Sequence, residues 1–493
     1  MTESDASIED ILADDDISDS PTPYRPLPVV SKISVKNLFG RYSYDLEVPL
    51  VDNKASRLML LHGDNGSGKT TLLKLAWNLL STDEPRGHKT AIARVPFSEF
   101  SIDFQDGRNV TARRSDSLIG TFDLVANGLP LTSRATATYV ADEELRVTAR
   151  SDYESGLLEA SEFSDPQQLL PFITREFSSE PLDINDQEAP ARWRIKTFLQ
   201  NLEIEPVLLG DDRELHSDNR DKTGEYRGDP RSRAARLMET TPGQRVTAEL
   251  EATIARVNRL TRGLTINAQR SGSFQEASIY LNVLRRIGGG ASHPEKGDPS
   301  ARVEQVVAEL EAQIPRFAEF QLITEFDPHE FRSMIQNIGL DNRAIAAAVI
   351  LPYLESLSAR IDALTNAEKS IRMLTSHANY YLRDKRLTYS PQSGFRVRTD
   401  ELKSRALSPA KLSSGERQML LLLCNAVLAS GDRTLFLIDE PELSLGVPWQ
   451  RQILTSLLDL TEGTDVQFIV ATHSVEMVTA NAPSLVRLVN KIG

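Results

Sequence analysis

The hydrophobic pattern near the start of the chain predicts strands that lead into one helix. Val29 to Lys36 alternates apolar and polar residues, which is typical of a half-buried strand, and residues 38–46 continue toward a hairpin. Leu58 to Leu61 is wholly apolar, as expected for a buried central strand. A glycine-rich turn follows, and then residues 71–80 have the period of an amphipathic helix.

Two later parts of the chain return to the two-residue period. Residues 95–150 alternate and are broken by Asp106-Gly107 and Asn127-Gly128, which predicts an antiparallel meander. From residue 386 onward two short alternating segments surround a turn at Pro391–Gly394, and the rest of the chain alternates strand and helix patterns. Together these patterns predict an α/β fold.

The middle of the chain, residues 156–385, is mainly helical in pattern and often broken by proline. Its longest clean helical stretch is about 243–287, which limits any arm to roughly 65 Å at ~1.5 Å rise per residue. A chain of 493 residues also invites more than one unit. We therefore expect four parts: an acidic tail (1–24), the N-terminal part of an α/β head (25–155), a helical insertion (156–385) and the C-terminal part of the head (386–493).

Charge is concentrated at the N-terminus. The chain has a formal net charge of −14, and its first 24 residues hold eight acids and no Lys or Arg, so −6 remains without them. This composition predicts a disordered, solubilising tail, with a partner-docking motif around Ile8, Ile11 and Leu12 as the alternative. The acidity is therefore no argument against an anionic partner for the rest of the chain.

The cysteine count and the hydropathy exclude several classes of protein. The single cysteine, Cys424, excludes an intramolecular disulfide and a Cys₄ or Cys₂His₂ zinc site, and its apolar surroundings predict a small buried hydrophobe. No apolar run approaches the roughly 20 residues that span a bilayer, and an acidic N-terminus is the opposite of a signal peptide. We expect a cytoplasmic protein with no membrane partner.

The segment after Leu61 fits the phosphate-loop pattern G-x-x-x-x-G-K-[ST]. Its glycines let backbone N–H groups point at phosphates, and the helix that starts there adds the positive end of its dipole. Lys69 is expected to reach the β- and γ-phosphates of ATP, and the Thr70 hydroxyl to hold Mg²⁺. The predicted nucleotide-binding residues here are Gly63, Asp64, Asn65, Gly66, Ser67, Gly68, Lys69, Thr70 and Thr71.

Two further predicted strands end in polar side chains. The apolar run that starts at Thr434 ends in Asp439, expected to bind Mg²⁺, and Glu440, expected to polarise the attacking water. The next strand, from Val466, ends in His473, at a place where a sensor of the γ-phosphate is needed. We therefore predict Glu440, His473 and Lys69 as catalytic residues, and Thr70 and Asp439 as metal-binding residues.

A Ser-Ser-Gly turn precedes the apolar helix that is predicted over residues 419–429. Ser413, Ser414 and Gly415 would form another anion site at a helix N-terminus. The alternative is an ordinary helix N-cap supplied by one of the two serines. The position of the turn about 25 residues before Asp439 favours the anion site.

These four motifs, in the order in which they occur along the chain, resemble those of the ATP-binding-cassette (ABC) ATPases of the SMC/RecF/OLD branch. Ser413 to Glu416 is similar to the signature motif of that superfamily, and Asp439 to Leu445 and Ala471 to Ser474 are similar to OLD-type Walker B and histidine-switch sequences. The resemblance covers residues 25–155 and 386–493. It implies an ATPase head with a mixed sheet and an antiparallel β-subdomain, which binds ATP and Mg²⁺ and hydrolyses ATP slowly.

The resemblance also implies a head-to-tail homodimer. Each ATP would lie between Lys69 of one chain and Ser413 and Gly415 of the other. The insertion is too short for an SMC coiled coil, and the chain ends 20 residues after His473, without the nuclease domain of OLD proteins. The outline looks like the stand-alone ATPases of bacterial antiphage operons, of the Septu, retron or PARIS type, which work with a separately encoded nuclease or toxin.

The sequence departs from the resemblance at three places. The D-loop position after Leu445, commonly Asp or His, is Gly446. No glutamine occupies the place expected for the Gln-loop. Gln105 is expected in a β-turn instead, so it does not fill that role. Phe39 and Tyr42, upstream of the phosphate loop, are candidates for stacking on adenine.

The function expected is an ATP-gated sensor subunit of an antiphage defence complex that controls a separate effector. One alternative is a RecF- or SMC-like repair ATPase that acts directly on DNA, and another is a scaffold in which ATP is structural. Residues 220–270 hold eleven basic side chains against six acids, which fits a DNA-binding face or, equally, a solvated helix of mixed charge. The eleven are Arg220, Lys222, Arg227, Arg231, Arg233, Arg236, Arg245, Arg256, Arg259, Arg262 and Arg270.

Overall fold

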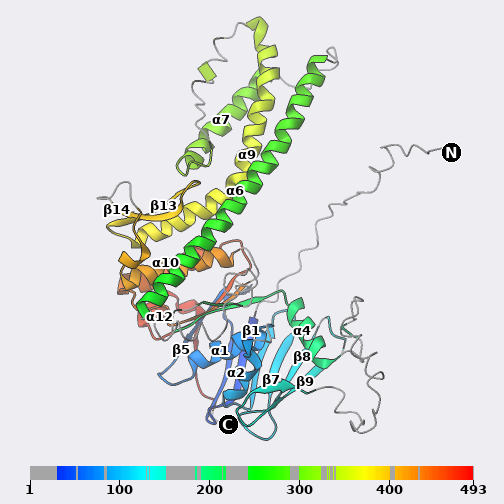
Figure 1. Cartoon of the computed structure of the whole chain (residues 1–493), viewed down its shortest axis with the longest axis vertical. Coiled ribbons are helices and arrows are strands. Elements are labelled where there is room, and N and C mark those ends of the chain that lie inside the picture. The colour runs from blue at the N-terminus through cyan, green and yellow to red at the C-terminus, as the bar shows by residue number, and fades with distance from the viewer. Residues whose placement is uncertain are drawn as a thin grey trace, which may run out of the picture.

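The computed structural model shows a head that contains two β-sheets and a helical arm that rises from it (Figure 1). The structure describes residues 30–51, 54–82, 86–128, 130–132, 134–150, 184–185, 190–211, 213, 215–217, 242–288, 299–323, 330, 332–333, 337, 340–399, 406–430 and 434–491. The predicted acidic tail, and residues 220–241 of the predicted basic segment, lie outside them.

The first sheet is an antiparallel meander of seven strands in the order β10-β9-β8-β7-β6-β1-β2. Gly107 and Gly128 close two of its turns with φ of 83° and 94°, values that glycine adopts without strain. The predicted meander is confirmed, and Gln105 lies in the β6–β7 turn as expected. The strands are β1 (Val30–Leu38), β2 (Tyr42–Glu47), β6 (Glu99–Phe104), β7 (Asn109–Arg113), β8 (Phe122–Asn127), β9 (Ala135–Ala141) and β10 (Val147–Ala149).

The second sheet has six strands in the order β12-β11-β15-β16-β5-β17, and all neighbours are parallel except β11 and β12. Because β15, β16 and β5 are adjacent and parallel, their carboxyl ends meet at one edge of the sheet. This edge receives all the strand-end motifs of the sequence. The strands are β5 (Leu58–His62), β11 (Glu205–Leu209), β12 (Leu215–Ser217), β15 (Thr434–Asp439), β16 (Gln467–Thr472) and β17 (Leu485–Arg487).

Helices cover the second sheet and form the arm. The head helices are α1 (Lys69–Leu80), α2 (His88–Arg94), α4 (Ala191–Asn201), α10 (Ser414–Ala429), α11 (Val447–Leu460) and α12 (Val475–Ala480). The arm consists of α6 (Pro242–Gly288), α7 (Pro299–Ala318) and α9 (Leu340–Tyr381), and two small hairpins are β3 (Leu50–Val51) with β4 (Lys54–Ala55) and β13 (Lys385–Ser390) with β14 (Gly394–Thr399). None of the helices that the structure describes is long and apolar enough to span a bilayer.

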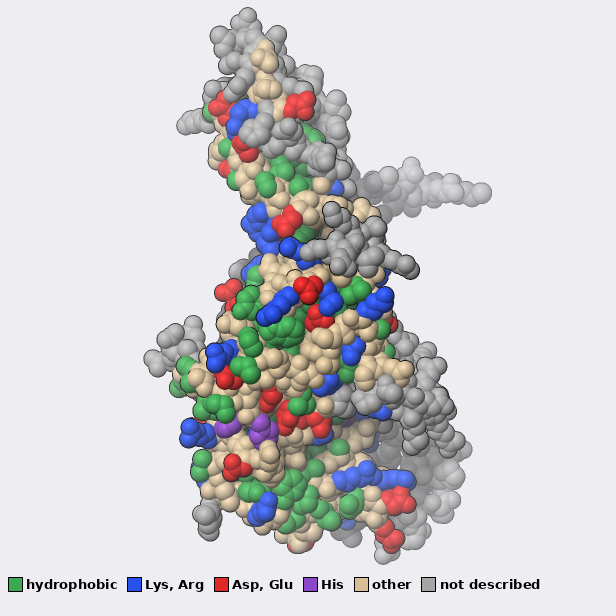
Figure 2. Space-filling view, turned by 90° about the vertical axis from the view of Figure 1, so that its left-hand side faces the viewer, with side chains coloured by type: hydrophobic (Ala, Val, Ile, Leu, Met, Phe, Trp, Pro, Cys, Tyr) green, Lys and Arg blue, Asp and Glu red, His purple; other side chains and the backbone are tan. Residues whose placement is uncertain are grey.

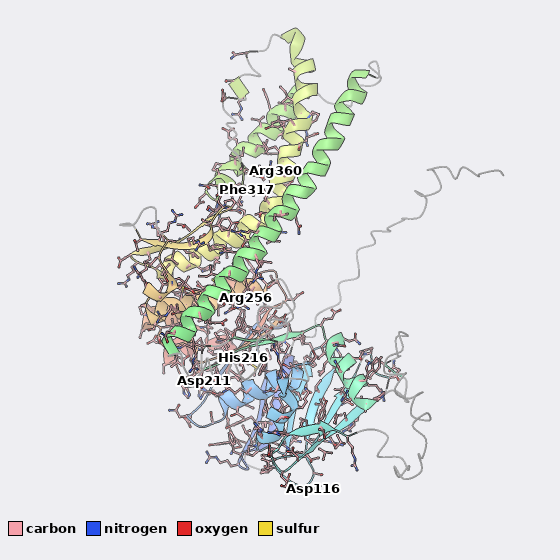
Figure 3. The ribbon with its side chains drawn as sticks, in the orientation of Figure 1. Asp116, Asp211, His216, Arg256, Phe317 and Arg360 are labelled. Atoms are coloured by element: carbon pink, nitrogen blue, oxygen red, sulfur yellow. The ribbon has the colours of Figure 1, made fainter. Side chains whose placement is uncertain are left out.

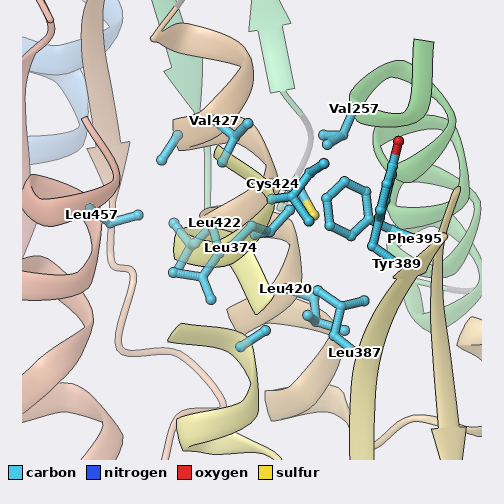
Figure 4. Close-up of a cluster of buried hydrophobic side chains, with 14 of the residues drawn as sticks. Val257, Leu374, Leu387, Tyr389, Phe395, Leu420, Leu422, Cys424, Val427 and Leu457 are labelled. Carbon is cyan, nitrogen blue, oxygen red and sulfur yellow. The ribbon is translucent and has the colours of Figure 1, made fainter. Parts of the chain in front are cut away.

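The second sheet separates two hydrophobic cores. Successive side chains of a strand point to opposite faces, so Leu58 and Leu60 pack into one core and Met59 and Leu61 into the other. The first of these cores continues through α10 and α11 into the base of the arm, where Cys424 is buried as predicted (Figure 4). The second core lies between α1 and the antiparallel meander.

The head is larger than the sequence pattern indicates. The prediction placed everything from 156 to 385 in the insertion, whereas β11 pairs with β15 inside the ATPase sheet and α4 packs on β8 and β9. The sequence of β11 is a short apolar run, and nothing in it predicts that this strand pairs with β15. The arm itself begins with α6, whose 47 residues span about 70 Å at ~1.5 Å per residue, close to the predicted limit.

Candidate functional site

The phosphate loop lies between β5 and α1, as the sequence predicts, and its backbone demands glycine. Gly66 and Gly68 have φ of 78° and 93°. A Cβ on Gly68 would lie 2.7 Å from Cδ2 of Leu38, so the space as well as the φ angle excludes a side chain. The Tyr44 hydroxyl donates to the Ser67 carbonyl at 2.9 Å and so anchors the loop to the meander. The loop is therefore a preformed cradle of backbone N–H groups.

Lys69 is buried at the start of α1 and is held inside the loop. Its Nζ donates to the carbonyls of Gly63 and Asp64 at 2.8 and 3.1 Å and lies 3.5 Å from Nδ1 of His473. Burial lowers the pKa of Lys69, and the neighbouring carboxylates of Glu440 and Asp439 oppose that shift. The ammonium is thus positioned where a polyphosphate would compete for it with two backbone carbonyls.

Asp439 ends β15 and is 4% exposed. Among the described residues neither of its carboxylate oxygens has a hydrogen-bond partner, although the Thr70 hydroxyl is close enough to lower its pKa. Burial is the larger effect and, with the charge of Asp211, raises the pKa of Asp439 to about 6. A charged carboxylate that is buried without a partner is unfavourable in free energy, so Asp439 is suited to bind a cation.

The Asp439 and Thr70 pair fits Mg²⁺. Magnesium is usually bound through one or two carboxylates together with substrate phosphates and water, and a dedicated protein cage is unusual. The described residues contain no group of three or more His, Cys, Asp or Glu side chains that could hold a metal. Asp439 and the Thr70 hydroxyl would hold the ion, which would neutralise charge on the phosphates.

Glu440 and His473 face each other across the strand ends of β15 and β16. Glu440 adopts a left-handed backbone with φ of 46°, which is rare for a residue with a side chain. Its Oε1 lies 3.5 Å from Nε2 of His473. Lys69, His473 and Glu440 therefore form a connected row.

Glu442 belongs to the site, and the sequence reasoning gave it no role. Its Oε1 accepts hydrogen bonds from the Thr472 hydroxyl (2.7 Å), the His473 backbone N–H (2.6 Å) and the Ser474 backbone N–H (3.0 Å). One carboxylate oxygen thus fixes the backbone that carries His473. The third acid in Asp-Glu-Pro-Glu is the signal that could have identified it, because a strand end is a usual place for such an acceptor.

The predicted signature turn is the start of α10. Ser413 caps this helix: its Oγ accepts from the Glu416 N–H at 3.2 Å, and its own N–H donates to Glu416 Oε2 at 2.7 Å. The N-cap interpretation is therefore realised, while Ser413 and Ser414 remain exposed and free to meet a ligand. A Cβ on Gly415 would lie 2.5 Å from the Ser444 carbonyl oxygen, so glycine is required for this packing.

The loop from Glu440 to Gly446 joins the two motifs. Ser444, which also has a left-handed backbone (φ 69°), contacts Gly415 through its carbonyl and accepts a hydrogen bond from Arg213 at 2.6 Å. Arg213 follows β11, and its neighbour Asp211 lies 3.4 Å from Lys74 of α1. Figure 3 shows Asp211 and His216 near the junction of head and arm. This loop after β11 occupies the strand end next to Asp439, and no sequence signal indicated it.

The two groups of motifs stay apart within one chain. Among the residues described, no hydrogen bond joins Ser413–Arg417 to the phosphate loop. Of the two candidates for stacking on adenine, Phe39 lies against the phosphate loop, 3.4 Å from a Cβ placed on Gly68, and is 42% exposed. Tyr42 instead stacks on Tyr44 and under Arg41, so Phe39 is the better placed of the two.

Comparisons with known proteins give one family match and several similar structures. The family model AAA_21, described as AAA domain, putative AbiEii toxin, Type IV TA system, matches residues 58–479. Three solved structures are similar to the chain, which they cover to 92%. They are the Smc head domain with an extended coiled coil bound to the C-terminal domain of ScpA from Pyrococcus furiosus (12% identity, TM-score 0.32, 92% of that chain), the Smc head domain with a coiled coil and joint from Pyrococcus yayanosii (13%, 0.31, 94%) and the SmcHead bound to the C-winged helix domain of ScpA (10%, 0.34, 92%). No curated protein matches.

Proposed function

The chain belongs to the AAA_21 family of AAA domains, and from this membership we propose that it is an ATP-gated switch subunit of an antiphage defence complex. ATP closes two copies of the chain head to tail, and the closed state controls a separately encoded nuclease or toxin. Hydrolysis reopens the pair. The family description, which names a toxin of a type IV toxin–antitoxin system, supports a partnership with a second gene product.

One observation carries the proposal: the ATP site is divided within the chain. Lys69, Asp439 and His473 gather at one edge of the sheet, whereas Ser413 and Ser414 are exposed at the start of α10 with no hydrogen bond to the phosphate loop among the described residues. A helix N-terminus with two exposed hydroxyls is suited to a phosphate that another chain presents. A second copy would complete both sites at once, because a two-fold arrangement repeats each contact.

We propose a role in hydrolysis for each of these residues. Lys69 would exchange its two backbone carbonyls for β- and γ-phosphate oxygens, and Asp439 with Thr70 would hold Mg²⁺. Glu440 would accept the proton of the attacking water, and His473, which lies between Lys69 and Glu440, would contact the γ-phosphate. The row of Lys69, His473 and Glu440 would thus contact bound ATP, and Glu440 is also the first residue of the loop that contains Ser444.

The closing step is tested with Glu440→Gln, which keeps the size of the side chain and removes the base. We expect the variant to form a stable dimer with ATP and Mg²⁺, measured by light scattering after gel filtration, and its hydrolysis rate to fall ~100-fold or more. Lys69→Ala is the control and should remain open. A Glu440→Gln protein that binds ATP but stays monomeric would contradict the proposal.

The defence role is tested separately from the ATPase. The chain is expressed with the proteins encoded beside it, and complexes are purified with and without ATP. Co-elution with a nuclease or toxin, with turnover unchanged by DNA, supports the switch. A lone dimer whose hydrolysis is stimulated by DNA supports the alternative, a repair ATPase that acts directly on DNA.

A further inference from the structure

The hairpin formed by β13 and β14 has two faces of opposite character. Its register places Arg386 opposite Arg398 and Thr388 opposite Arg396, and residues that lie opposite each other share a face. The outer face therefore carries three arginines and the hydroxyls of Thr388 and Ser390. The arginines at 386 and 396 are exposed and the third is half-buried.

The inner face of the hairpin fixes this arrangement. It is apolar, and Leu387, Tyr389, Phe395 and Val397 are all buried against α10 and α6 in the cluster of Figure 4. A slip of one residue would bury the arginines and expose these four side chains, so the register is strongly specified. The outer face is thus held rigidly toward solvent, at the junction of head and arm (Figure 1).

The arginines of the outer face lower the stability of the hairpin, whereas its hydroxyls already have partners within it: Thr388 donates to the Arg396 carbonyl at 3.2 Å, and the Ser390 and Ser393 hydroxyls lie 2.7 Å apart. Like charges that lie directly opposite on neighbouring strands destabilise a hairpin, and Arg386 and Arg398 are such a pair. Within the described part of the chain none of the three arginines forms an ion pair, and Arg396 donates only to the Ser393 carbonyl of its own turn. This occurs in a protein with a net charge of −14, where acidic side chains are plentiful.

We propose that this arginine face, defined as Arg386, Arg396, Arg398, Thr388 and Ser390, binds the phosphate backbone of a nucleic acid. Arginine forks and hydroxyls are the groups that contact phosphates and sugars. The face presents no apolar side chain, so it lacks the aromatic anchors that are common at the centre of protein–protein interfaces. Figure 2 shows Lys and Arg side chains, with a few acids among them, across the side of the molecule to which the hairpin belongs.

The long helix α6 extends the arginine face on one side. Arg262 Nη2 lies 3.5 Å from the Gln392 carbonyl, at the tip of the hairpin. Further down the helix Arg256 is engaged with Glu249 at 3.4 Å, so this part of the predicted basic segment is neutralised internally. The proposed contact therefore centres on the hairpin, and α6 contributes one additional arginine.

The arginine face is linked to the ATP site through the inner side of the same hairpin. Lys385 Nζ forms an ion pair with Glu416 Oε1 at 2.8 Å, and Glu416 in turn caps Ser413 at the start of α10. A nucleic acid on the outer face would thus contact a hairpin that is itself ion-paired to the start of α10, where the signature turn lies. The proposal concerns binding in the absence of nucleotide, so it does not depend on the proposed ATP switch.

The test is the salt dependence of binding to a fluorescent 30-base-pair DNA duplex, measured by anisotropy without nucleotide on the full chain. Each phosphate neutralised contributes about 0.9 to the slope of log K against log salt concentration. The triple variant Arg386→Gln, Arg396→Gln and Arg398→Gln should lower the magnitude of the slope by about 3 and weaken binding more than ~10-fold. An unchanged slope and affinity would overturn the proposal.

Two control proteins keep the test falsifiable. Arg94→Gln, Arg113→Gln and Arg487→Gln removes three exposed arginines of the head and lowers the net charge equally, so a matching loss would reveal a general charge effect and overturn the assignment. The Lys-for-Arg triple variant at the hairpin keeps the charge and should retain most of the slope. If the Gln variant does not fold, Arg396→Gln by itself should lower the slope by about 1.

A competition experiment separates nucleic acid from an acidic protein. Polyglutamate of matched charge is added to the complex with duplex DNA and, separately, to a complex with single-stranded RNA. Displacement of either nucleic acid only at large charge excess supports the phosphate assignment. Equal competition by polyglutamate would overturn it and identify an acidic peptide as the ligand. A chain without residues 1–24 serves in parallel, so that the eight acids of the tail do not mask the site.

Discussion

The half-site around Lys69 and the half-site around Ser413 are built in opposite ways. Lys69 is buried and already contacts the half-buried His473, and the loop backbone admits only glycine at two positions. Around Ser413 the hydroxyls are exposed, and the internal contacts run away from the site, to Lys385 on the hairpin. We call the first the binding half and the second the reporting half after the roles proposed for them, since the first would bind a phosphate chain and the second would respond to a phosphate that another chain presents.

One segment of the chain connects the two half-sites. The loop from Glu440 to Gly446 touches both, since Glu442 fixes the backbone of His473 and Ser444 packs on Gly415. Two of its residues have left-handed backbones, a conformation that persists only when the surrounding contacts impose it. Changes in either half should therefore have distinct and separable effects.

The largest effect is expected from Lys69→Ala in the binding half. The ammonium makes two hydrogen bonds to loop carbonyls that phosphate oxygens would replace. Loss of two hydrogen bonds from a charged donor costs about 3 kcal/mol or more, so ATP affinity should fall ~100-fold, as measured by calorimetry. Ser413→Ala, in the other half, should leave the affinity of the monomer unchanged. Equal losses in the two variants would remove the distinction between the halves.

Glu442→Ala should lower the hydrolysis rate by up to about 100-fold while ATP binding is retained. Three hydrogen bonds to the His473 segment are lost, and a displacement of about 1 Å at a catalytic group has an effect of this size. Glu442→Gln keeps an acceptor oxygen and should recover part of the rate. Single-turnover kinetics measures the hydrolysis rate, and the NMR signal of the His473 ring reports a change in the position of the ring. A normal rate with a shifted ring signal would show that the position of His473 does not limit hydrolysis.

Gly415→Ala addresses the reporting half. A Cβ at this position meets the Ser444 carbonyl at 2.5 Å, and overpacking of this kind costs about 1–3 kcal/mol. We expect weaker ATP-dependent dimerisation, by about 10-fold, with monomeric ATP affinity unchanged. Gly263→Ala is the matched control, because no atom lies within 4 Å of the added Cβ. Dimerisation that survives Gly415→Ala would show that the Ser444 loop does not carry the signal.

The smallest effect is expected at Cys424, which lies inside α10. Burial raises the pKa of its thiol to about 12, so it stays protonated and shielded at neutral pH. If α10 moves as a rigid body, a maleimide should not react in the absence or presence of ATP and DNA. Reaction in denaturant provides the positive control. Rapid labelling with ATP would mean that the reporting half opens its core, and rigid motion would be excluded.

Much of the fold could be predicted because its signals are local. The glycines of the phosphate loop are required by backbone conformation, and the period of two marks the meander strands and the β13–β14 hairpin. The strand-end acids Asp439 and Glu440 and the histidine at 473 could be assigned for the same reason. Parallel strands that are adjacent bring their carboxyl ends together, so recognition of the strands was enough to place these residues at one edge.

By itself the sequence determined the phosphate loop, the strand-end residues, the cap at Ser413 and the buried state of Cys424, because each depends on neighbours within a few positions. The tertiary structure decided that β11 belongs to the head, that Glu442 holds the His473 backbone, and that Gly415 packs on Ser444. It also decided that three arginines from two strands share one exposed face. Such contacts join residues far apart in the chain, and their register comes from the packing of a shared core that no local pattern encodes.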